Sequence, residues 1–400
     1  MALAVKAVEA RSRGGSVELP GRESGVSLGV ERFQSPLRFL MVGGGTGGHI
    51  FPALAVAEEL RARGARPEHS GREYLIEFLG TKRPLEARLI PGAGFPLHTI
   101  NAAGLKGMSG FRRLRNLMVL PRTALATARV LRDFQPQVVV GVGGYLAGPV
   151  MVEAALQDIP TLLIEPNALP GFTNRALGPV VRLAAVAFEE AARFYGEKAR
   201  VTGLPLRAAF HTVPTKRHEA PFTILIVGGS QGSKAINDLM TQCAPLLKRE
   251  SGWLKLVHQT GERDYNAVRE AFLEHGVPAH VQVFIEDMPR ALAQADLVVS
   301  RAGATAVAEL AAAGRAALLI PFPAATDQHQ LANARALERV GAARVILQGE
   351  LTPQRLMGEI RDLLSDPLRL IWMERAAKSL ARPEAAAHIA DLVEEMAARV

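Results

Sequence analysis

The feature of this sequence that most constrains its fold is a pattern that occurs twice: a short apolar run that leads directly into a glycine-rich loop. Residues 39–42 (FLMV) lead into 43–49 (GGGTGGH), and residues 223–227 (TILIV) lead into 228–233 (GGSQGS). An apolar run, a glycine turn and a helical periodicity in this order are typical of a buried parallel strand and the helix that covers it. The repeat therefore predicts an α/β fold of two Rossmann-like domains whose parallel sheets face a central cleft.

Further apolar runs and breaks set the expected domain organisation of the 400 residues. Strands are expected at 74–79, 138–142, 161–164, 281–285, 297–300, 317–320 and 343–347, and a helix at 53–63. We expect a flexible N-terminal extension (1–36), an N-terminal Rossmann-like domain (37–203), a linker with three prolines (204–221) and a C-terminal Rossmann-like domain (222–366). A helical segment (367–400) has no evident sheet partner and is expected to pack back on the N-terminal domain.

The cysteine content and the apolar runs point to the cytoplasm. Cys243 is the single cysteine, so no disulfide framework can form within the chain and a reducing compartment is expected. No apolar run approaches the roughly 20 residues of a spanning helix, and the N-terminus lacks the apolar segment of a secretory signal.

Basic residues are concentrated in one stretch. The net charge is +8, and residues 100–132 contain seven Lys or Arg and no acidic residue, with apolar side chains between them. This composition suits an anionic membrane surface. A solvated helix face accounts for it equally well. Nucleic acid is disfavoured, because aromatic residues that could stack on bases are scarce here.

The first glycine loop predicts an oxyanion site. Thr46, Gly47 and Gly48 stand where backbone N–H groups at a helix start can meet a phosphate. The loop has neither the Gly-Lys-Ser/Thr of a Walker motif nor a regular dinucleotide fingerprint. His49 beside it is a candidate general base for neutral pH, and the alternative is a helix-capping or core histidine.

Three later segments add candidate ligand contacts in the second half. Ser230 lies in the second glycine loop, and Glu309 follows the small residues after the 297–300 run, where a carboxylate could accept ribose hydroxyls. Gln330 could both donate to and accept from a sugar. For each of them a solvated surface position is the alternative. No Asp-x-Asp and no paired histidines occur, so neither a metal nor a cofactor is expected, and helix dipoles and hydroxyls would stabilise a leaving diphosphate.

Together these segments resemble one bacterial enzyme family. GGGTGGHIFPALA, GVGGYLAGP, IEPNALPGFTN, VGGSQGS, FIEDM, RAGATAVAEL and DQHQLANA occur in the order and spacing of the UDP-N-acetylglucosamine:N-acetylmuramyl-(pentapeptide) pyrophosphoryl-undecaprenol N-acetylglucosaminyltransferases. The resemblance implies a GT-B fold and metal-independent, inverting transfer of N-acetylglucosamine to the muramyl C4 hydroxyl of lipid I, which yields lipid II for peptidoglycan. It also implies a peripheral location on the cytoplasmic face of the plasma membrane, contact through residues 100–132, and membership of a cell-wall synthesis complex.

The resemblance also implies roles for individual residues. His49 corresponds to the general base, and the N-terminal domain is implied to take the acceptor and associate with the membrane. The residues implied to bind the donor are Thr46, Gly47, Gly48, Asn167, Arg207, Ser230, Ile285, Ala304, Thr305, Ala306, Val307, Ala308, Glu309 and Gln330. Ile285 corresponds to a residue whose backbone contacts uracil. The chain departs from the common pattern at Ala306, where a hydroxyl residue is frequent.

Two other readings of the same residues stay open at this point. A glycolipid synthase or UDP-sugar epimerase would share the fold and differ in its acceptor. A catalytically silent nucleotide-sugar-binding subunit would share the donor site, but it would not need both His49 and Glu309.

Overall fold

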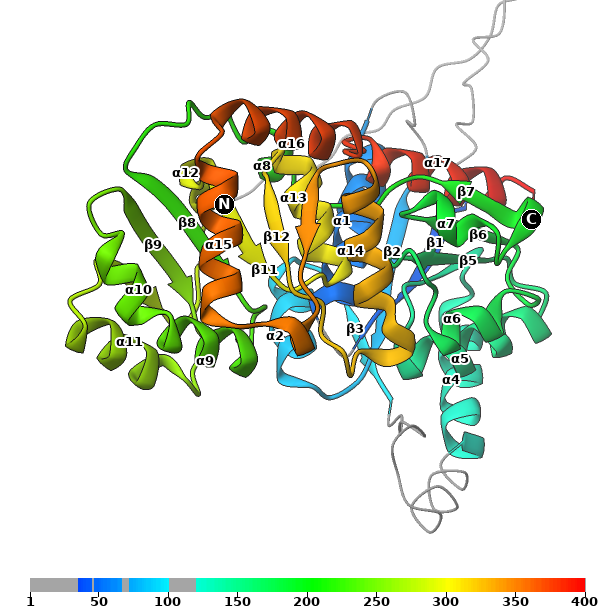
Figure 1. Cartoon of the computed structure of the whole chain (residues 1–400). Helices are drawn as coiled ribbons and strands as arrows, with labels where there is room; N and C mark the ends of the chain where they lie inside the picture. Colours follow the sequence, from blue (N-terminus) through cyan, green and yellow to red (C-terminus); the bar gives the residue numbers. More distant parts are fainter. Residues whose placement is uncertain (1–34, 45–46, 67–71, 101–119, 400) are drawn as a thin grey trace, which may run out of the picture.

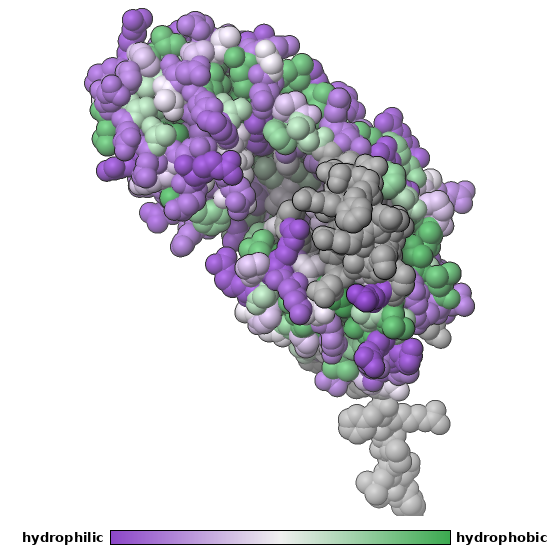
Figure 2. Space-filling model, turned by 90° about the horizontal axis from the view of Figure 1, so that it is seen from below, coloured by the Kyte–Doolittle hydropathy of each residue, from purple (hydrophilic) through white to green (hydrophobic). Residues whose placement is uncertain are grey.

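The computed structural model describes residues 35–44, 47–66, 72–100 and 120–399 and consists of two α/β domains, each built on a parallel sheet. Figure 1 shows the domains side by side, with the C-terminal helices along one edge of both. Seen from below, they form two lobes that meet at a hollow (Figure 2). The predicted α/β class, with two domains each built on a parallel sheet, is confirmed.

The N-terminal domain has a seven-stranded sheet in the order β3-β2-β1-β4-β5-β6-β7. Its strands are β1 (Leu37–Val42), β2 (Tyr74–Gly80), β3 (Leu97–Thr99), β4 (Val138–Gly141), β5 (Thr161–Glu165), β6 (Leu183–Val186) and β7 (Ala199–Val201). Its helices are α1 (Gly47–Gly64), α2 (Pro84–Gly92), α4 (Leu120–Phe134), α5 (Gly144–Leu156), α6 (Phe172–Leu177) and α7 (Glu189–Ala192), with the short η2 (Gly196–Lys198). β1 and β4, the central strands, are buried almost throughout, which explains their continuous apolar sequence.

The C-terminal domain repeats this plan with six strands in the order β10-β9-β8-β11-β12-β13. The strands are β8 (Phe222–Val227), β9 (Leu254–Gln259), β10 (Ala279–Gln282), β11 (Leu297–Ser300), β12 (Ala317–Leu319) and β13 (Ala343–Val345). The helices are α8 (Ala208–His211), α9 (Lys234–Gln242), α10 (Ala244–Arg249), α11 (Tyr265–Glu274), α12 (Met288–Gln294), α13 (Ala304–Ala313), α14 (His329–Arg339), α15 (Pro353–Leu364) and α16 (Pro367–Ser379), with the short η3 (Thr326–Gln328) and η4 (Gln348–Glu350).

Two boundaries differ by three residues or more from the sequence-based expectation. The helix expected at 53–63 begins six residues earlier, at Gly47, so His49 lies in its first turn and not in the loop before it. The strand expected at 281–285 ends at Gln282, because the chain turns there and the Ile285 N–H donates to the Gln259 side chain instead of to a neighbouring strand.

The C-terminal helices divide between the domains. Leu370 and Met373 of α16 are buried in the core of the C-terminal domain. α17 (Ala385–Ala397) instead packs against α1, and its Ile389 and Val393 are buried in the core of the N-terminal domain. Arg63 of α1 holds α17 by hydrogen bonds to Asp391, Glu394 and the Ala387 carbonyl oxygen at 2.6–2.9 Å. The chain therefore crosses between the domains twice.

A buried cluster of charges fixes the linker to the C-terminal domain. His218 Nδ1 lies 2.8 Å from the Asp296 carboxylate, and its Nε2 lies 3.3 Å from that of Glu374 on α16. Lys216 also pairs with Asp296, and Arg315 donates to the Pro214 carbonyl oxygen at 2.6 Å. Although burial opposes the charged form, the two carboxylates raise the pKa of His218 to about 9.

The protonated His218 should stabilise the C-terminal domain in a pH-dependent way. Because its pKa is raised from 6.5 to about 9, this stabilisation is fully present below pH 6.5 and is lost as the pH rises through about 9. We expect His218→Gln to lower the free energy of unfolding by about 3 kcal/mol at pH 7 and by much less at pH 10. Urea denaturation followed by tryptophan fluorescence measures this, because Trp253 and Trp372 both lie in this domain.

The matched control is His280→Gln, since His280 is exposed on β10 and should change the free energy of unfolding little at either pH. An equal loss for His218→Gln at pH 7 and pH 10 would contradict the assignment of a charged His218.

Candidate functional site

The candidate site is formed by loops that follow the central strands of both sheets. In a parallel sheet these loops all lie at one edge, the carboxyl ends of the strands, where open α/β folds bind ligands. In the N-terminal domain the loops follow β1, β4 and β5, and in the C-terminal domain they follow β8, β11 and β12.

His49 stands at the N-terminal half of this site. It is half-buried in the first turn of α1 and makes a hydrogen bond with the Gly44 backbone. Gly144, with φ +82°, begins α5 beside it, and a Cβ there would lie 3.3 Å from the Gly44 carbonyl oxygen and 3.7 Å from His49 Nδ1. Burial lowers the pKa of His49, and the electrostatic effect of His329 on α14 of the other domain lowers it further. The imidazole is therefore neutral at pH 7 and can take up a proton.

The N-terminal end of α13 stands at the other half. Gly303 caps this helix, which begins at Ala304, so the first-turn N–H groups of Ala304, Thr305 and Ala306 have no carbonyl partner within the helix. Ala306 lines the cavity beside the second glycine loop. Such a helix end attracts a phosphate group through its N–H groups and its dipole.

Glu309 and Arg207 lie close enough to interact electrostatically. Glu309 is mostly buried on α13, and its burial raises the pKa of the carboxyl to about 7, against the opposing effect of Arg207. Arg207 itself is exposed at the start of α8, with its guanidinium 5.1 Å from the Phe210 ring. Val307 and Ala308 face a second cavity at the domain hinge, away from the cavity that Ala306 lines.

The second glycine loop forms one wall of a cavity of about 590 Å³. Gly232 has φ +74°, and a side chain there would collide with the Thr260 carbonyl oxygen, so glycine is required at this turn. Arg301, after β11, lines the same cavity and donates to Ser233 Oγ (2.9 Å), to Gln348 Oε1 (2.8 Å) and to the Ile320 carbonyl oxygen (3.0 Å). Burial lowers the pKa of Arg301 to about 10, so the side chain remains a cation at neutral pH.

Two of the sequence-predicted residues sit at the margin of this cavity. Ser230 is exposed in the glycine loop, whose neighbouring residues form the wall. Ile285 is buried, and Gln259 fixes its position by accepting the Ile285 N–H at 2.8 Å and donating to the Gly229 carbonyl oxygen at 2.8 Å. A backbone contact of Ile285 with a base would therefore use its carbonyl oxygen.

Gln330 and Asn167 approach the site from opposite domains. Gln330 lines the 590 Å³ cavity, and its Oε1 accepts the Phe322 N–H at 3.0 Å, which leaves its amide group as a donor. The preceding residues Asp327 and Gln328 both have left-handed backbone angles, a strain that proteins retain mostly at functional sites. Asn167 follows β5 and bonds to Glu165 and to Asn333 of α14.

Sequence reasoning missed three buried polar residues of the site: Glu165, Arg301 and Asn333. Each stands in a segment that carries the family resemblance, next to residues that were named. A charged residue directly at the end of an apolar strand was the available signal for Glu165 and Arg301. Thr46, in contrast, lies outside the described residues, whereas Gly47 and Gly48 form the start of α1.

This arrangement fits one class of protein: a glycosyltransferase, with a candidate nucleotide-sugar site on its C-terminal domain and a candidate base on its N-terminal domain. Family models agree with this class. Residues 39–186 match the glycosyltransferase family 28 N-terminal domain, and residues 223–390 match the glycosyltransferase family 28 C-terminal domain.

Similar individual proteins show which family of glycosyltransferases this is. The chain is 45% identical over 359 residues, 89% of its own length and 92% of the relative's, to the UDP-N-acetylglucosamine--N-acetylmuramyl-(pentapeptide) pyrophosphoryl-undecaprenol N-acetylglucosamine transferase of Myxococcus xanthus. The crystal structure of Acinetobacter baumannii MurG superimposes with a TM-score of 0.74 at 34% identity, covering 90% of this chain and all of that one. The chain belongs to this family of N-acetylglucosamine transferases.

A likeness to an epimerase is confined to the fold. The UDP-GlcNAc 2-epimerase of Neisseria meningitidis superimposes with a TM-score of 0.64 over 91% of this chain and all of that one, but at 15% identity. The alternative of a UDP-sugar epimerase is therefore not favoured.

Glu309 leads to a pH-dependent prediction for donor binding. A carboxylate accepts ribose hydroxyls best when it is ionised, and the pKa of Glu309 in the empty site is about 7. We expect the Kd of UDP-N-acetylglucosamine to rise by up to tenfold between pH 8 and pH 6, and Glu309→Gln to bind more weakly and with little dependence on pH. Calorimetric titration measures both. The same pH dependence in Glu309→Gln would show that another group is responsible.

Proposed function

We propose that this enzyme transfers N-acetylglucosamine from UDP-N-acetylglucosamine to the muramyl C4 hydroxyl of lipid I, the undecaprenyl-diphosphate-linked N-acetylmuramoyl-pentapeptide, and so makes lipid II for peptidoglycan. The observation that carries the proposal is the placement of a neutral histidine on one domain and a phosphate-binding helix end on the other, in a chain 45% identical to a transferase with this name.

The donor is assigned to the C-terminal domain. The diphosphate lies at the N-terminus of α13, where Ala304 to Ala306 offer N–H groups, and the cation of Arg301 adds a favourable field. Glu309 accepts the ribose hydroxyls, the Ile285 carbonyl oxygen accepts from uracil, and Gln330 donates to the sugar. Arg207 and Ser230 are the other proposed donor contacts on this side of the site. The N-terminal domain contacts the donor through Thr46, Gly47, Gly48 and Asn167.

The reaction is a single displacement. The acceptor hydroxyl oxygen forms a bond to the anomeric carbon while the bond from that carbon to the diphosphate oxygen breaks, so UDP leaves with the electron pair and the configuration inverts. His49 takes the hydroxyl proton. The helix dipole of α13 and its free N–H groups stabilise the negative charge that develops on UDP.

A donor and acceptor screen with mass detection tests the function. UDP-N-acetylglucosamine with a lipid I analogue should give a disaccharide product and UDP. With diacylglycerol, or with no acceptor, we expect no new glycoside and no epimer of the donor. A folded protein that binds UDP and makes no disaccharide would overturn the proposal in favour of a silent nucleotide-sugar-binding subunit.

Replacement of His49 tests the proposed base. We expect His49→Ala to lower kcat by 100-fold or more and to leave the Kd of UDP within about twofold of wild type. In the wild type, kcat/KM should fall on the acid side only below pH 6.5, because the pKa of His49 is lowered and a base must be unprotonated. Parallel losses of UDP affinity and turnover would identify a structural histidine instead.

We further propose that the enzyme is peripheral on the cytoplasmic face of the plasma membrane, where its lipid substrate lies. Among the described residues, no helix combines the length and apolarity needed to cross a bilayer. Residues 101–119 of the basic stretch lie outside the described residues, but α4 contains its end. Arg122, Leu125, Arg129 and Arg132 are all exposed at spacings of three or four residues, which puts them on one face of α4.

Neighbouring helices carry further exposed apolar side chains. α4 packs against α5, and α5 against α6, at one end of the N-terminal domain (Figure 1). Leu125 of α4, Leu156 of α5 and Phe172 of α6 are 72%, 76% and 67% exposed. From below, hydrophobic residues on this lobe occur in groups among hydrophilic ones (Figure 2). Exposed apolar and basic side chains together suit the interface of an anionic bilayer.

Removal of the three arginines of α4 tests this surface. We expect Arg122→Gln, Arg129→Gln and Arg132→Gln together to lower partitioning onto phosphatidylglycerol vesicles by up to about 100-fold, at about 1 kcal/mol per charge. The matched control replaces three exposed arginines of the C-terminal domain, Arg263, Arg269 and Arg355. Vesicle sedimentation measures both, and equal losses in the two triple variants would mean that net charge, not this face, drives binding.

A further inference from the structure

A single buried amide joins the two domains at the site. Asn333 of α14 is fully buried. Its Oδ1 accepts the Ala168 N–H of the N-terminal domain at 2.8 Å. Its Nδ2 donates to Asn167 Oδ1 of the same domain at 3.1 Å and to the Ala302 carbonyl oxygen of the C-terminal domain at 3.1 Å. Both donor hydrogens and the acceptor oxygen are thus used, and the bonds reach loops of both domains.

On the N-terminal side, Asn333 binds a loop that is itself held rigidly. Glu165 Oε1 accepts the Asn167 N–H at 2.8 Å and its Nδ2 at 3.1 Å. Glu165 is fully buried, and its other oxygen accepts from Asn174 at 2.8 Å and from the Tyr195 hydroxyl at 3.4 Å. Asn333 therefore bonds to a loop whose position in the N-terminal domain is already set by hydrogen bonds to Glu165.

On the C-terminal side, Asn333 binds directly before the phosphate-binding helix. Ala302 is followed by Gly303, the N-cap of α13, and then by the proposed diphosphate contacts. The position of the Ala302 carbonyl oxygen thus sets where the helix end begins. One side chain spans from the Asn167 loop to this helix end.

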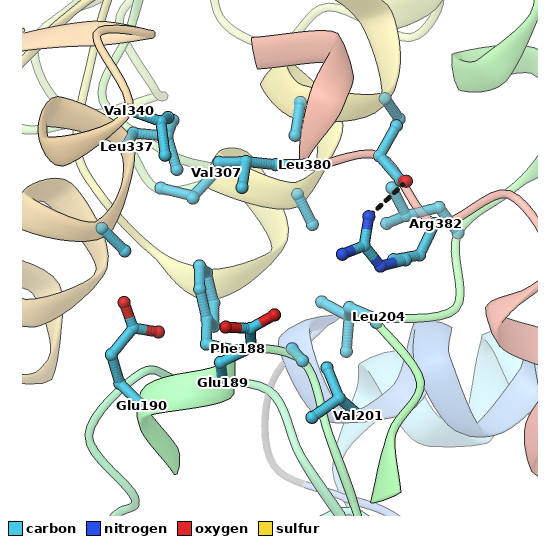
Figure 3. Close-up of a pocket in the computed structure, with 18 of the residues that line it drawn as sticks. Phe188, Glu189, Glu190, Val201, Leu204, Val307, Leu337, Val340, Leu380 and Arg382 are labelled. Atoms are coloured by element: carbon cyan, nitrogen blue, oxygen red, sulfur yellow. Dashed lines mark hydrogen bonds between the residues drawn. The ribbon is translucent and has the colours of Figure 1, made fainter. Parts of the chain in front are cut away.

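Among the residues that the structure describes, no buried amide on the hinge side of the interface bonds to both domains. There the domains enclose a cavity of about 330 Å³, lined by both chain crossings and by α13 and α14. Figure 3 shows Leu204 of one crossing, Arg382 of the other, and Val307 and Val340 around the open space. Phe188 packs from this side against the core of the C-terminal domain, and Ala308 of α13 packs against the core of the N-terminal domain. These contacts are apolar and non-directional, so they specify the alignment of the two donor-site loops less strictly than hydrogen bonds do.

Within the described part of the chain, two further ion pairs join the domains near the site and the hinge, and both are partly exposed. Arg175 lies 3.2 Å from Asp327, with 37% and 26% of the side chains exposed, and Arg339 lies 2.7 Å from Glu190, with 60% and 30% exposed. Exposed ion pairs contribute little because water competes for both partners. Buried hydrogen bonds with all partners satisfied hold geometry more strictly, since breaking them leaves unpaired polar groups.

We propose that Asn333 is a positioning residue that sets the register between the Asn167 loop and the phosphate-binding end of α13, so that the two domains present one donor site. It acts through Asn167 and Ala302 and touches no reacting atom. The proposal rests on the transferase function proposed above. An amide is required, because aspartate in its place would put a carboxylate oxygen about 3 Å from two other oxygens.

Activity measurements on Asn333→Asp and Asn333→Ala test the register. We expect kcat/KM for UDP-N-acetylglucosamine to fall 10- to 100-fold in both, mainly through kcat, because small misplacements of bound groups slow a reaction strongly. Free UDP, bound by the C-terminal domain, should keep its Kd within about threefold. Because a loss of folded protein would also lower apparent kcat and leave the Kd of UDP unchanged, kcat is expressed per UDP-binding site counted by calorimetric titration. A normal kcat per binding site would assign the loss to stability and overturn the proposal.

A double-mutant cycle tests whether Asn333 acts through Asn167. If Asn333 acts through Asn167, Asn167→Ala combined with Asn333→Ala should lose little more kcat than the larger single loss. The control is Arg339→Gln, which breaks an interdomain ion pair away from the donor cavity and should stay within twofold of wild type. Additive losses in the cycle, or wild-type kcat/KM in Asn333→Asp, would overturn the proposal.

Small-angle X-ray scattering measures the arrangement of the two domains and does not depend on an activity assay. The wild type should give one compact profile, and Asn333→Asp a larger radius of gyration, while an unchanged far-UV circular dichroism spectrum shows that the variant is folded. If the wild type lacks transfer, the proposed function fails while scattering still decides the role of Asn333. Identical profiles of the two proteins would refute the role of Asn333 in aligning the domains.

Discussion

The parallel arrangement of the strands is the constraint on which the rest of this structure depends. Because every strand of a parallel sheet runs the same way, all the loops that follow the strands lie at one edge. Each domain places a glycine loop after its first strand, β1 or β8, at the centre of its sheet. In the loop after β8, glycine is needed at Gly232, because a side chain there would collide with the Thr260 carbonyl oxygen. Two parallel sheets therefore offer two edges at which ligands can bind. The proposed active site lies between these edges, so the two domains must be held together.

The two edges carry different chemistry for physical reasons. The C-terminal domain offers a helix end and the buried cation of Arg301, which suit a diphosphate. The N-terminal domain offers a histidine whose pKa is lowered by burial, which suits proton removal near neutral pH. In the proposed mechanism, diphosphate binding and proton removal are therefore assigned to different domains. The angle between the domains consequently matters as much as any single contact, and the hydrogen bonds of Asn333 to both domains help to set it.

The sequence predicted the fold class and most central strands, because these are buried on both faces and read as continuous apolar runs. The 297–300 strand matches β11 residue for residue. The strands β3 and β7 were not predicted, since each has three residues and lies at an edge of the sheet. β9 was missed because Lys255 and His258 interrupt its apolar pattern, and β6 because its short alanine-rich run suits a helix equally well.

The contacts that assemble the site could not be predicted from one sequence. Asn333 and Asn167 are 166 residues apart, and no local pattern indicates that their amides meet. Individual motifs gave candidate residues, and the order of the motifs gave the family. The buried partners that orient those residues, Glu165 and Gln259 among them, became evident only from the packing of the two sheets.

The most direct test of this account is a crystal structure of the enzyme with UDP-N-acetylglucosamine bound. The account predicts the diphosphate at the N-terminus of α13 and the anomeric carbon on the side of the site that faces His49, with the hydrogen bonds of Asn333 intact. A diphosphate bound away from α13, or an anomeric carbon turned away from His49, would contradict the division of work between the two domains.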